Sequence, residues 1–505
     1  MKAVDTIDSF GGIDADTDDL LYDCFEDHEA FNALLDRKRF IVLGRKGAGK
    51  TAMFKRLLQK HEPTFFSLGH TFTDYPWEHH QLQQKKGVPP NQAFTAAWTY
   101  FIALTLAKII LNHDNSLPQK ESDFDSMARL EKFVIDSYGS RDPDVVTIFR
   151  PSTKLRLKPY FKLDFKVLSA GVSPESVPIT ELPLIAHEVN ENILSAALPL
   201  LNDEHEYHIS FDQLDLDFDP NDPEYSRRLI GLLLAARRIN IRAKELGKKL
   251  FVSIFLRSDI YALLQFEDKN KLTENDCSII EWDRATTTHT LRELMERRFT
   301  RLLSDATDPA VSWDMLFSGK EMTNRQSQYN HILARTFSRP RDMIKFSNEI
   351  LREHKRASAS GSTESNDRFD NPDIIAARDQ YSDYLLREID DEIHKQVPDY
   401  KRYLEVLKLI GTFQFTLEVF EKTYNERKTS LGLVATPIDA LRSLYDFSII
   451  AYLKTGGRNA GAEYVFAYRE PSVRFDERAS SFRVHYGLLE SLGLLKRNSA
   501  DSPVE

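Results

Sequence analysis

The sequence predicts an α/β protein with an αβα core of parallel strands, followed by helices and a smaller α+β domain at the C-terminus. Three observations lead to this prediction. An apolar run at 40–43 stands directly before a glycine-rich loop, and a helical pattern follows the loop. Two further apolar runs, 207–211 and 250–256, flank a long helical pattern, as strands of a parallel sheet do. Short strand and turn patterns after residue 400 indicate the α+β domain.

Composition and charge narrow the class of protein. The chain has 505 residues, a formal net charge of −10 and 29% charged residues, which is typical of a globular protein with two to four domains. The negative charge argues against binding nucleic acid over the whole surface, although it leaves room for a local basic patch. Cys24 and Cys277 are too few for a disulfide framework or a zinc site, so we expect a reducing, cytoplasmic compartment.

One segment is apolar enough to be compared with a membrane span. Residues 95–111 contain few polar side chains. The segment is short for a membrane-spanning helix and contains Lys108, so a buried core helix is the favoured interpretation over a span. The N-terminal residues are acidic and have no apolar core, unlike a signal peptide. We therefore expect no association with a membrane.

The glycine-rich loop carries the clearest functional signal. Its G-x-x-x-x-G-K-T pattern lies between a strand and a helix, as in a phosphate-binding P-loop; the alternative is a turn that only connects the two elements. Glycines let successive backbone N–H groups surround phosphate oxygens, and the helix N-terminus adds positive potential. We expect Lys50 to reach the β- and γ-phosphates and the Thr51 hydroxyl to bind Mg²⁺. The predicted nucleotide-binding residues are Gly44, Arg45, Lys46, Gly47, Ala48, Gly49, Lys50 and Thr51.

An acidic side chain on a neighbouring strand completes a P-loop site, because it helps to hold the magnesium ion. The second apolar run ends at Asp212, which we predict to be this carboxylate and a metal ligand together with the P-loop threonine; the alternative is a turn aspartate at a strand end. Asp215 is the candidate base, with a helix-capping or merely exposed acid as the alternative. The nearby Asp217 and Asp219 keep the choice of base open. Gln213 stands where many ATPases have a catalytic glutamate, and this predicts slow hydrolysis.

Two arginines are candidates for sensing the terminal phosphate. Arg257 ends the third apolar run, and we expect it to stabilise phosphate charge in its own chain or across a subunit interface. The alternative is a surface arginine at a strand end. Arg341 opens a helix and has the placement of a sensor arginine on a helical lid, with Arg339 as the alternative residue and helix capping as the alternative role. The predicted catalytic residues are therefore Lys50, Asp212, Asp215, Arg257 and Arg341.

The predicted domain boundaries follow from breaks in these patterns. Residues 1–290 form the P-loop core, which is interrupted by an insertion at about 112–185. Amphipathic patterns predict a helical lid at 291–354. Residues 355–372 are rich in Ser, Asn and Asp and predict a flexible linker. Residues 373–505 predict a helical connector and the α+β domain.

Three further patterns are less specific. Residues 154–167 alternate apolar and basic side chains, which predicts a hairpin inserted in the core; a solvated edge strand is favoured over a contact surface for nucleic acid or an acidic partner. His79 and His80 form a pair without a third ligand at useful spacing, so we expect no metal site there. Helix-like spacing at 15–38 predicts a helix pair that either helps to hold the base or covers the sheet edge.

Taken in order, these motifs resemble the P-loop ATPases of the AAA+/STAND assemblage, which includes KAP-like proteins. The sequence is most similar to the Sll-type P-loop ATPases that are often found in anti-phage defence loci. The resemblance implies ATP and Mg²⁺ as cofactors, a homo-oligomer, a helical lid and a winged-helix domain. ATP is preferred to GTP only on this resemblance, because no base-reading motif is present. The motifs that carry the resemblance lie at 44–51, 211–215, 255–261 and 339–342, within roughly residues 15–350.

The C-terminal patterns fit a winged-helix-like α+β domain. Helical patterns at 403–410 and 441–445 precede strand patterns at 448–452 and 464–468, and a turn at 456–459 predicts a hairpin between these strands. A winged helix is able to bind DNA, but no dense basic recognition helix is visible. We therefore favour a regulatory or protein-contact role.

Two functions are compatible with these expectations. The first is an ATP-binding and ATP-hydrolysing molecular switch that oligomerises or changes conformation to control a separate effector or sensor protein, for example in anti-phage defence. The alternative is a DNA-dependent AAA+-type ATPase of the loader or initiator kind, which would use the basic hairpin and the winged helix. Stimulation of hydrolysis by DNA with a steep salt dependence separates the two. A nucleotide kinase is disfavoured, because the chain lacks an obvious small lid and has much additional architecture.

Overall fold

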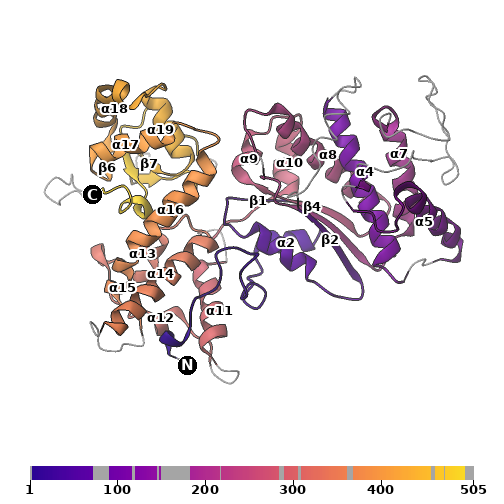
Figure 1. Cartoon of the computed structure of the whole chain (residues 1–505), viewed down its shortest axis with the longest axis horizontal. Helices are drawn as coiled ribbons and strands as arrows, with labels where there is room; N and C mark the ends of the chain where they lie inside the picture. The colour runs from indigo at the N-terminus through magenta and orange to yellow at the C-terminus, as the bar shows by residue number, and fades with distance from the viewer. Residues whose placement is uncertain are drawn as a thin grey trace. The chain divides into compact units, whose positions relative to one another are not determined.

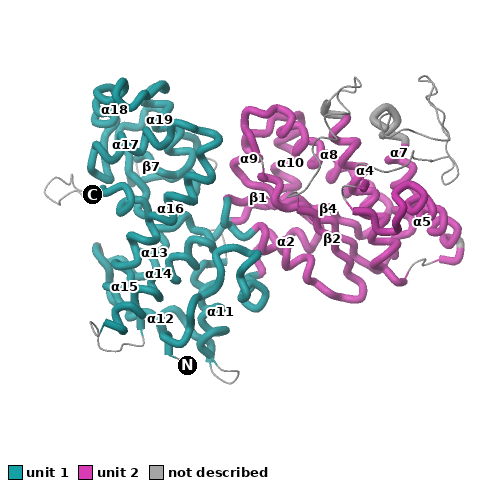
Figure 2. The backbone as a smooth tube through the Cα atoms, viewed as in Figure 1, with its two compact units in different colours: residues 1–26, 46–49, 281–505 teal, residues 27–45, 50–280 magenta. Residues whose placement is uncertain are grey.

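The computed structural model describes residues 3–71, 90–116, 120–144, 147–148, 182–216, 218–283, 289–304, 309–360, 368–455, 461–470 and 473–494. The expected hairpin at 154–167, the pair His79-His80 and the turn at 456–459 lie outside these residues. The chain forms two compact units, and each is described by itself (Figure 2). The sheet unit consists of residues 27–45 and 50–280, and the helical unit of residues 1–26, 46–49 and 281–505.

The sheet unit is built on a five-stranded parallel sheet in the order β2-β3-β4-β1-β5 (Figure 1). β4 therefore lies between β1, which leads into the glycine-rich loop, and β3, which ends in Asp212. This arrangement confirms the predicted mixed α/β fold with a parallel sheet. The strands are β1 (Ile41–Gly44), β2 (Phe65–Thr71), β3 (Glu206–Asp212), β4 (Leu250–Arg257) and β5 (Cys277–Ile279).

Helices cover both faces of this sheet. Trp98 of α4 packs against Phe211 of β3, and Phe54 of α2 packs against Phe255 of β4. Phe211 pairs in register with Ile254, the neighbour of Phe255, and successive residues of a strand point to opposite faces. Helices α4 and α2 therefore lie on opposite faces. The helices of this unit are α1 (Glu29–Leu35), α2 (Lys50–Leu58), α4 (Pro90–Asn112), α5 (Phe124–Tyr138), α7 (Leu182–Ala197), α8 (Pro223–Glu245), α9 (Ser258–Leu263) and α10 (Lys269–Asp276).

Helix α4 contains the apolar segment that was compared with a membrane span. Its residues Ala93–Asn112 are long and apolar enough to cross a membrane, but 83% of the most apolar window is buried inside the protein. The helix packs against α7 and α8. The Trp98 indole donates a hydrogen bond to the backbone oxygen of Arg228 at 2.9 Å. At Gly231 of α8 a Cβ atom would lie 2.8 Å from Phe94, so the absence of a side chain allows close approach of the two helices. These contacts are those of a core helix.

The N-terminal residues differ from the predicted helix pair. Within residues 15–38 only α1 is helical, and residues 13–24 consist mostly of turns and bends. Short aspartate side chains hold these turns: Asp14 accepts from the backbone N–H of Asp16 at 3.0 Å, and Asp18 accepts from that of Gly12 at 3.0 Å. Such local bonds compete with helical ones, which explains why helix-like spacing was misleading here. Asp18 also forms a buried ion pair with Arg298, which fixes the segment within the helical unit.

The helical unit contains six α-helices between residues 291 and 393 of the described chain. Helix α14 extends to Ala359, past residue 355, where we expected a linker to begin; residues 361–367 lie outside the described part. Its last turns stay helical because Leu351 and His354 are buried, and His354 Nδ1 lies 2.9 Å from Asp373 Oδ2. The helices are α11 (Leu291–Leu303), α12 (Trp313–Leu316), α13 (Gln328–Leu333), α14 (Pro340–Ala359), α15 (Asn371–Ala376) and α16 (Arg378–Ile393).

The C-terminal part of the helical unit combines three helices with an antiparallel sheet in the order β6-β9-β7-β8. Helices appear where patterns at 403–410 and 441–445 predict them, and strands appear close to the predicted 448–452 and 464–468. Helix α18 and the strands β6 and β9 were not predicted. The elements are α17 (Tyr400–Ile410), β6 (Gln414–Thr416), α18 (Leu417–Leu431), α19 (Pro437–Asp446), β7 (Ile450–Lys454), β8 (Glu463–Val465) and β9 (Ser481–Val484).

Candidate nucleotide-binding site

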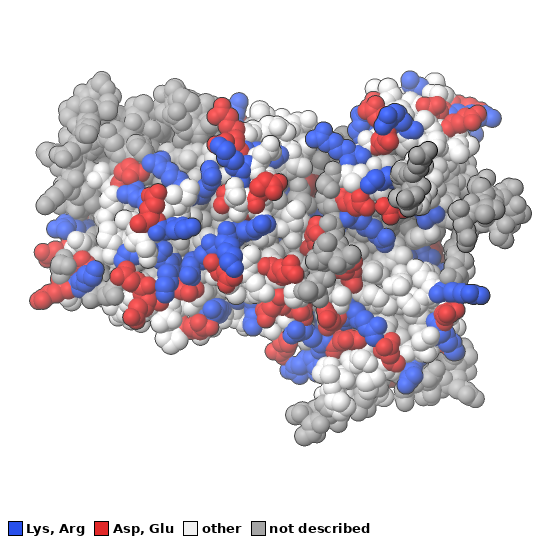
Figure 3. All heavy atoms as spheres, turned by 180° about the vertical axis from the view of Figure 1, so that it is seen from behind, with Lys and Arg blue, Asp and Glu red and all other residues white. Residues whose placement is uncertain are grey.

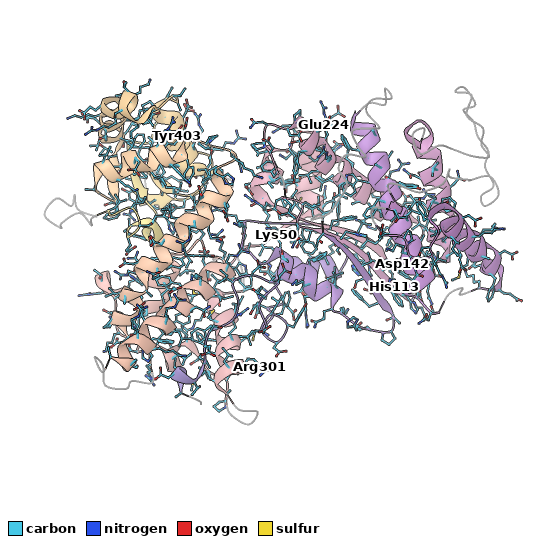
Figure 4. All side chains as sticks on the ribbon, viewed as in Figure 1. Lys50, His113, Asp142, Glu224, Arg301 and Tyr403 are labelled. Carbon is cyan, nitrogen blue, oxygen red and sulfur yellow. The ribbon has the colours of Figure 1, made fainter. Side chains whose placement is uncertain are left out.

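The glycine-rich loop runs from the carboxyl end of β1 to the first residue of α2, Lys50, which Figure 4 labels. Gly47 and Gly49 have φ angles of +78° and +108°. Residues with a Cβ atom rarely adopt these angles, so the loop conformation requires glycine at both positions. This explains the spacing that predicted a P-loop and places it in the strand–loop–helix context that such a loop needs.

Lys50 belongs to the sheet unit and contacts the first two residues of the loop. Its Nζ atom donates hydrogen bonds to the backbone oxygens of Gly44 at 2.9 Å and Arg45 at 3.0 Å. Burial lowers the pKa of the ammonium group, while the nearby carboxylates of Asp215 and Asp212 act in the opposite direction. The ammonium group is therefore held where its positive charge is poorly solvated, which favours an anionic ligand.

The middle of the loop is held by residues of the helical unit. In a trans peptide the carbonyl and the next N–H group point in opposite directions. When a donor binds the carbonyl of one loop residue, the N–H group of the next residue points away from that donor and toward the side where a ligand would bind. Successive N–H groups on one side of a loop form the arrangement that binds phosphate. Three successive carbonyls accept such bonds: Lys46 from Arg339 Nη1 at 2.6 Å, Gly47 from the backbone N of Arg341 at 3.4 Å, and Ala48 from Trp282 Nε1 at 3.1 Å.

Asp212 lies at the carboxyl end of β3 and is 2% exposed. Burial raises the pKa of its carboxyl group to about 6, although hydrogen bonds from the Thr51 hydroxyl and the Gln213 backbone oppose the shift. Among the described residues, its Oδ2 atom has no hydrogen-bond partner. A buried, unpartnered carboxylate oxygen beside a threonine hydroxyl is a suitable ligand pair for Mg²⁺, which prefers oxygen. These two residues therefore fit the ion that the sequence predicted.

Arg257 ends β4 and pairs in register with Gly44, the first residue of the P-loop. Its guanidinium is 8% exposed and forms two hydrogen bonds to Asp259, at 3.1 and 2.6 Å. Nη1 also lies 3.4 Å from Asp215 Oδ2. The sheet therefore brings Arg257 and Asp215 together, and Asp215 approaches Lys50 closely enough to influence its pKa. A buried, doubly paired guanidinium favours a role in its own chain over one across a subunit interface.

The two lid arginines have different surroundings within the helical unit. Arg339 is 1% exposed, and its guanidinium bonds to Asp342 and Glu392, each at 2.8 Å. Arg339 therefore acts as a buried support for the loop. Arg341 is more exposed, donates from Nε to the backbone oxygen of Ile13 at 3.0 Å, and donates from Nη1 to Glu388 at 3.1 Å. Arg341 is the better of the two candidates for contacting phosphate.

Sequence reasoning missed three residues of this site. Trp282 binds the P-loop carbonyl, Asp259 holds Arg257, and Glu388 pairs with Arg341. Only Asp259 gave a signal, because it stands in the first helical turn after a strand that was itself predicted. Of the acids considered as alternative bases, Asp219 is exposed and Asp217 lies outside the described residues.

No group of three or more His, Cys, Asp or Glu side chains is arranged to hold a metal ion in the part of the chain that the structure describes. A resident metal centre built from protein ligands alone is therefore not seen among these residues. The pair Thr51 and Asp212 instead fits an ion that takes its remaining ligands from a bound nucleotide and water.

Comparison with known families gives a partial match. A family model described as the FunZ-associated C-terminal helical domain matches residues 289–390, which include most of the helices α11 to α16. The transposon gamma-delta 80.3 kDa protein of Escherichia coli (strain K12) is 23% identical over 463 residues. That match covers 87% of this chain but 61% of the relative, so the chain spans less than two thirds of it.

Two solved structures that match this chain are distantly similar to it. The ORC1 protein of Aeropyrum pernix in complex with DNA matches with a TM-score of 0.34 and 15% identity, and each chain is covered over 89% of its length. Cdc6p from Pyrobaculum aerophilum matches with a TM-score of 0.28 and 12% identity, covering 92% of this chain and 88% of that one. These TM-scores are too low to support a conclusion about fold or function. The assignment of the candidate site therefore depends on the geometry of this chain alone.

Proposed function

We propose that this chain is a P-loop ATPase of the AAA+ type that acts as a slow, nucleotide-dependent switch. The observation that carries the proposal is the arrangement at the carboxyl edge of the parallel sheet. The P-loop with Lys50 follows β1, a buried carboxylate bonded to Thr51 ends β3, and Arg257 ends the strand between them. A phosphate-binding loop, a metal pair and a cation on adjacent strands are what phosphoryl transfer to water needs.

Each residue has a role in this proposal. Lys50 and the backbone N–H groups of the loop bind the β- and γ-phosphates. Thr51 and Asp212 would hold Mg²⁺, which supplies neutralisation of charge on the phosphate oxygens. Asp215 accepts the proton of the attacking water, and Arg257 orients that carboxylate through the contact at 3.4 Å. Gln213 cannot accept this proton as a glutamate would, so we expect slow turnover.

The C-terminal part supports a regulatory role better than DNA binding. We assign it as winged-helix-like from the order α17-β6-α18-α19-β7-β8-β9. In that fold α19 is the helix that would enter DNA. Its exposed charges are balanced, because Arg442 pairs with Asp439 at 2.8 Å and also with Glu477. Burial raises the pKa of Asp446, at the end of the same helix, to about 6. Nothing on α19 offers the uncompensated positive charge that phosphate contacts require.

The visible face in Figure 3 agrees with this view, since basic and acidic side chains are interspersed over it. We therefore place the partner of the switch among proteins, as an effector or sensor and as further copies of the chain; anti-phage defence is the setting that the family resemblance suggests. The alternative, a DNA-dependent ATPase, rests on the lysine-rich pattern at 154–167 and on the similarity to a transposon protein.

Size-exclusion chromatography with light scattering tests the proposal. Wild type and Lys50→Ala are compared with and without Mg²⁺-ATP, with and without duplex DNA, at low and moderate salt. We expect a nucleotide-dependent rise in mass without DNA, which Lys50→Ala abolishes because it removes the charge facing the phosphates. A monomer that changes mass only with DNA would favour the alternative function. Absence of any response to ATP in mass or in binding would contradict both.

A further inference from the structure

One carboxylate in the helical unit serves two cations of the P-loop region. Glu388 of α16 lies with its Oε2 atom 3.1 Å from Arg341 Nη1 and 3.6 Å from Lys46 Nζ. Lys46 is also paired with Asp391, one turn further along the helix, at 2.8 Å. The side chain of Glu388 is 14% exposed, whereas that of Asp391 is 62% exposed. Glu388 is thus the less solvated of the two acids, and its charge acts through a lower local dielectric.

Arg341 packs directly on the P-loop, and this contact places the Glu388 carboxylate, its ion-pair partner, close to the loop. A Cβ atom added to Gly47 would lie 3.0 Å from Arg341 Cβ and 3.1 Å from its Cδ, so the arginine stem covers the glycine directly. The guanidinium is held from another side by the Ile13 carbonyl. The negative charge of Glu388 therefore stands beside the loop whose N–H groups would receive phosphate.

We propose that Glu388 is an internal counter-anion of the nucleotide site that sets its affinity. The inference rests on the proposed function and names a residue that opposes binding. In the nucleotide-free chain Glu388 neutralises Arg341 and part of the charge of Lys46. Phosphate oxygens carry the same sign of charge and compete with Glu388 for the two cations. Binding a triphosphate consequently includes the loss of these ion pairs, and Glu388 weakens the measured affinity.

The competing explanation is that Glu388 only anchors α16 to the loop. The two explanations predict opposite signs for nucleotide affinity. Removing a competing anion tightens binding, while removing an anchor loosens the site and weakens binding. A double-mutant cycle with Arg341 then shows whether the carboxylate acts through that guanidinium.

Isothermal titration calorimetry with Mg²⁺-ATP on the full-length chain tests the inference, with Glu388→Gln as the variant. Asp383→Asn is the matched control, because it removes the same charge from an exposed position of the same helix. We expect Glu388→Gln to bind about three- to tenfold more tightly at low salt, with the gain shrinking at high salt. We expect Asp383→Asn to bind as the wild type does. In an Arg341→Gln background the gain from Glu388→Gln should fall by at least about half, because one of its two cations is gone.

Glu388→Ala provides a second variant should the glutamine variant unfold, and thermal unfolding of each variant identifies that case. Wild-type binding that is sensitive to Lys50→Ala but is not tightened by either Glu388 variant would overturn this inference and leave the proposed function standing. A gain of equal size in Asp383→Asn would also overturn it, because the effect would then be one of net charge. Failure of the wild type to bind nucleotide would overturn the proposed function and this inference together.

Discussion

The carboxyl edge of the parallel sheet and the C-terminal α+β part differ in how their charged side chains are buried and paired. At the sheet edge, Asp212 is buried and its Oδ2 atom has no hydrogen-bond partner within the described part of the chain, while burial lowers the pKa of Lys50. In the C-terminal part, Arg442 of α19 pairs with two exposed acids. Buried charges that the protein leaves incompletely paired indicate a place where a ligand completes the pairing, whereas exposed pairs cost little and add little stability. The difference supports the proposal that the first region binds a ligand, and it agrees with a role of the second that needs no bound anion.

The largest effect should come from Asp212→Asn. Loss of the metal-side carboxylate should reduce Mg²⁺-dependent turnover about 100-fold or more, because charge on the phosphate oxygens is no longer neutralised in place. The measurement is phosphate release under saturating ATP, with ATP binding measured in parallel. Turnover within threefold of the wild type would remove Asp212 from the site.

The same variant has a pH signature in the metal-free protein. Because the pKa of Asp212 is raised in the folded chain to about 6, the folded state binds the proton more tightly than the unfolded state. The stability that this provides is present at low pH and is lost as pH rises through about 6. Denaturant unfolding should therefore show the wild type losing stability relative to Asp212→Asn between about pH 4 and 6, by about 1–3 kcal/mol. If the unfolding free energies of the wild type and of Asp212→Asn changed in parallel between these pH values, the conclusion that burial raises the pKa of Asp212 would be contradicted.

A smaller effect is expected from Asp215→Ala. This change removes the candidate base while leaving the P-loop intact, so turnover should fall about 10- to 100-fold with ATP binding changed less than threefold. Single-turnover hydrolysis and equilibrium binding separate the two quantities. Asp219→Ala, an exposed acid nearby, serves as the control and should behave as the wild type does. Unchanged turnover in Asp215→Ala would show that another group activates water.

The smallest effect is expected in the C-terminal part, where Arg442→Ala removes only exposed ion pairs. Unfolding free energy should fall by less than about 1 kcal/mol. Any binding to duplex DNA should keep its dependence on salt, since Arg442 is already paired with Asp439 and Glu477. Arg427→Ala, an exposed position of α18, is the matched control. A salt slope that decreases by about 1 only in Arg442→Ala would show a phosphate contact and would bring the two regions closer in function.

Local patterns predicted which residues lie at the carboxyl edge of the sheet, because each of these residues belongs to a motif within a short stretch of sequence. The P-loop needs glycines at fixed spacing, and Asp212 and Arg257 directly follow apolar strands. Trp282 and Glu388 could not be predicted, because Trp282 contacts Ala48 and Glu388 contacts Lys46, and each pair is separated by hundreds of residues. Their positions depend on how the helical unit packs, and a sequence pattern does not specify that packing.

Two wrong expectations have the same origin. We predicted the start of the linker from composition, yet α14 continues to Ala359, beyond the buried Leu351 and the buried His354, which pairs with Asp373. The helix pair before the P-loop was read from spacing, yet aspartate side chains such as Asp18 stabilise turns there. In both segments tertiary or side-chain contacts outweighed the local preference.

The hydrogen bond from Trp282 to the P-loop has an optical consequence. Indole emission depends on the polarity around the ring and on the partner of its N–H group, and here that partner is the backbone oxygen of Ala48. The side chain is also almost fully buried, at 6% exposure. Any rearrangement of the loop therefore changes the surroundings of this ring. Trp282 is therefore a natural fluorophore in contact with the phosphate-binding loop, and once its emission is separated from that of the other three tryptophans it reports the state of the loop without an attached label.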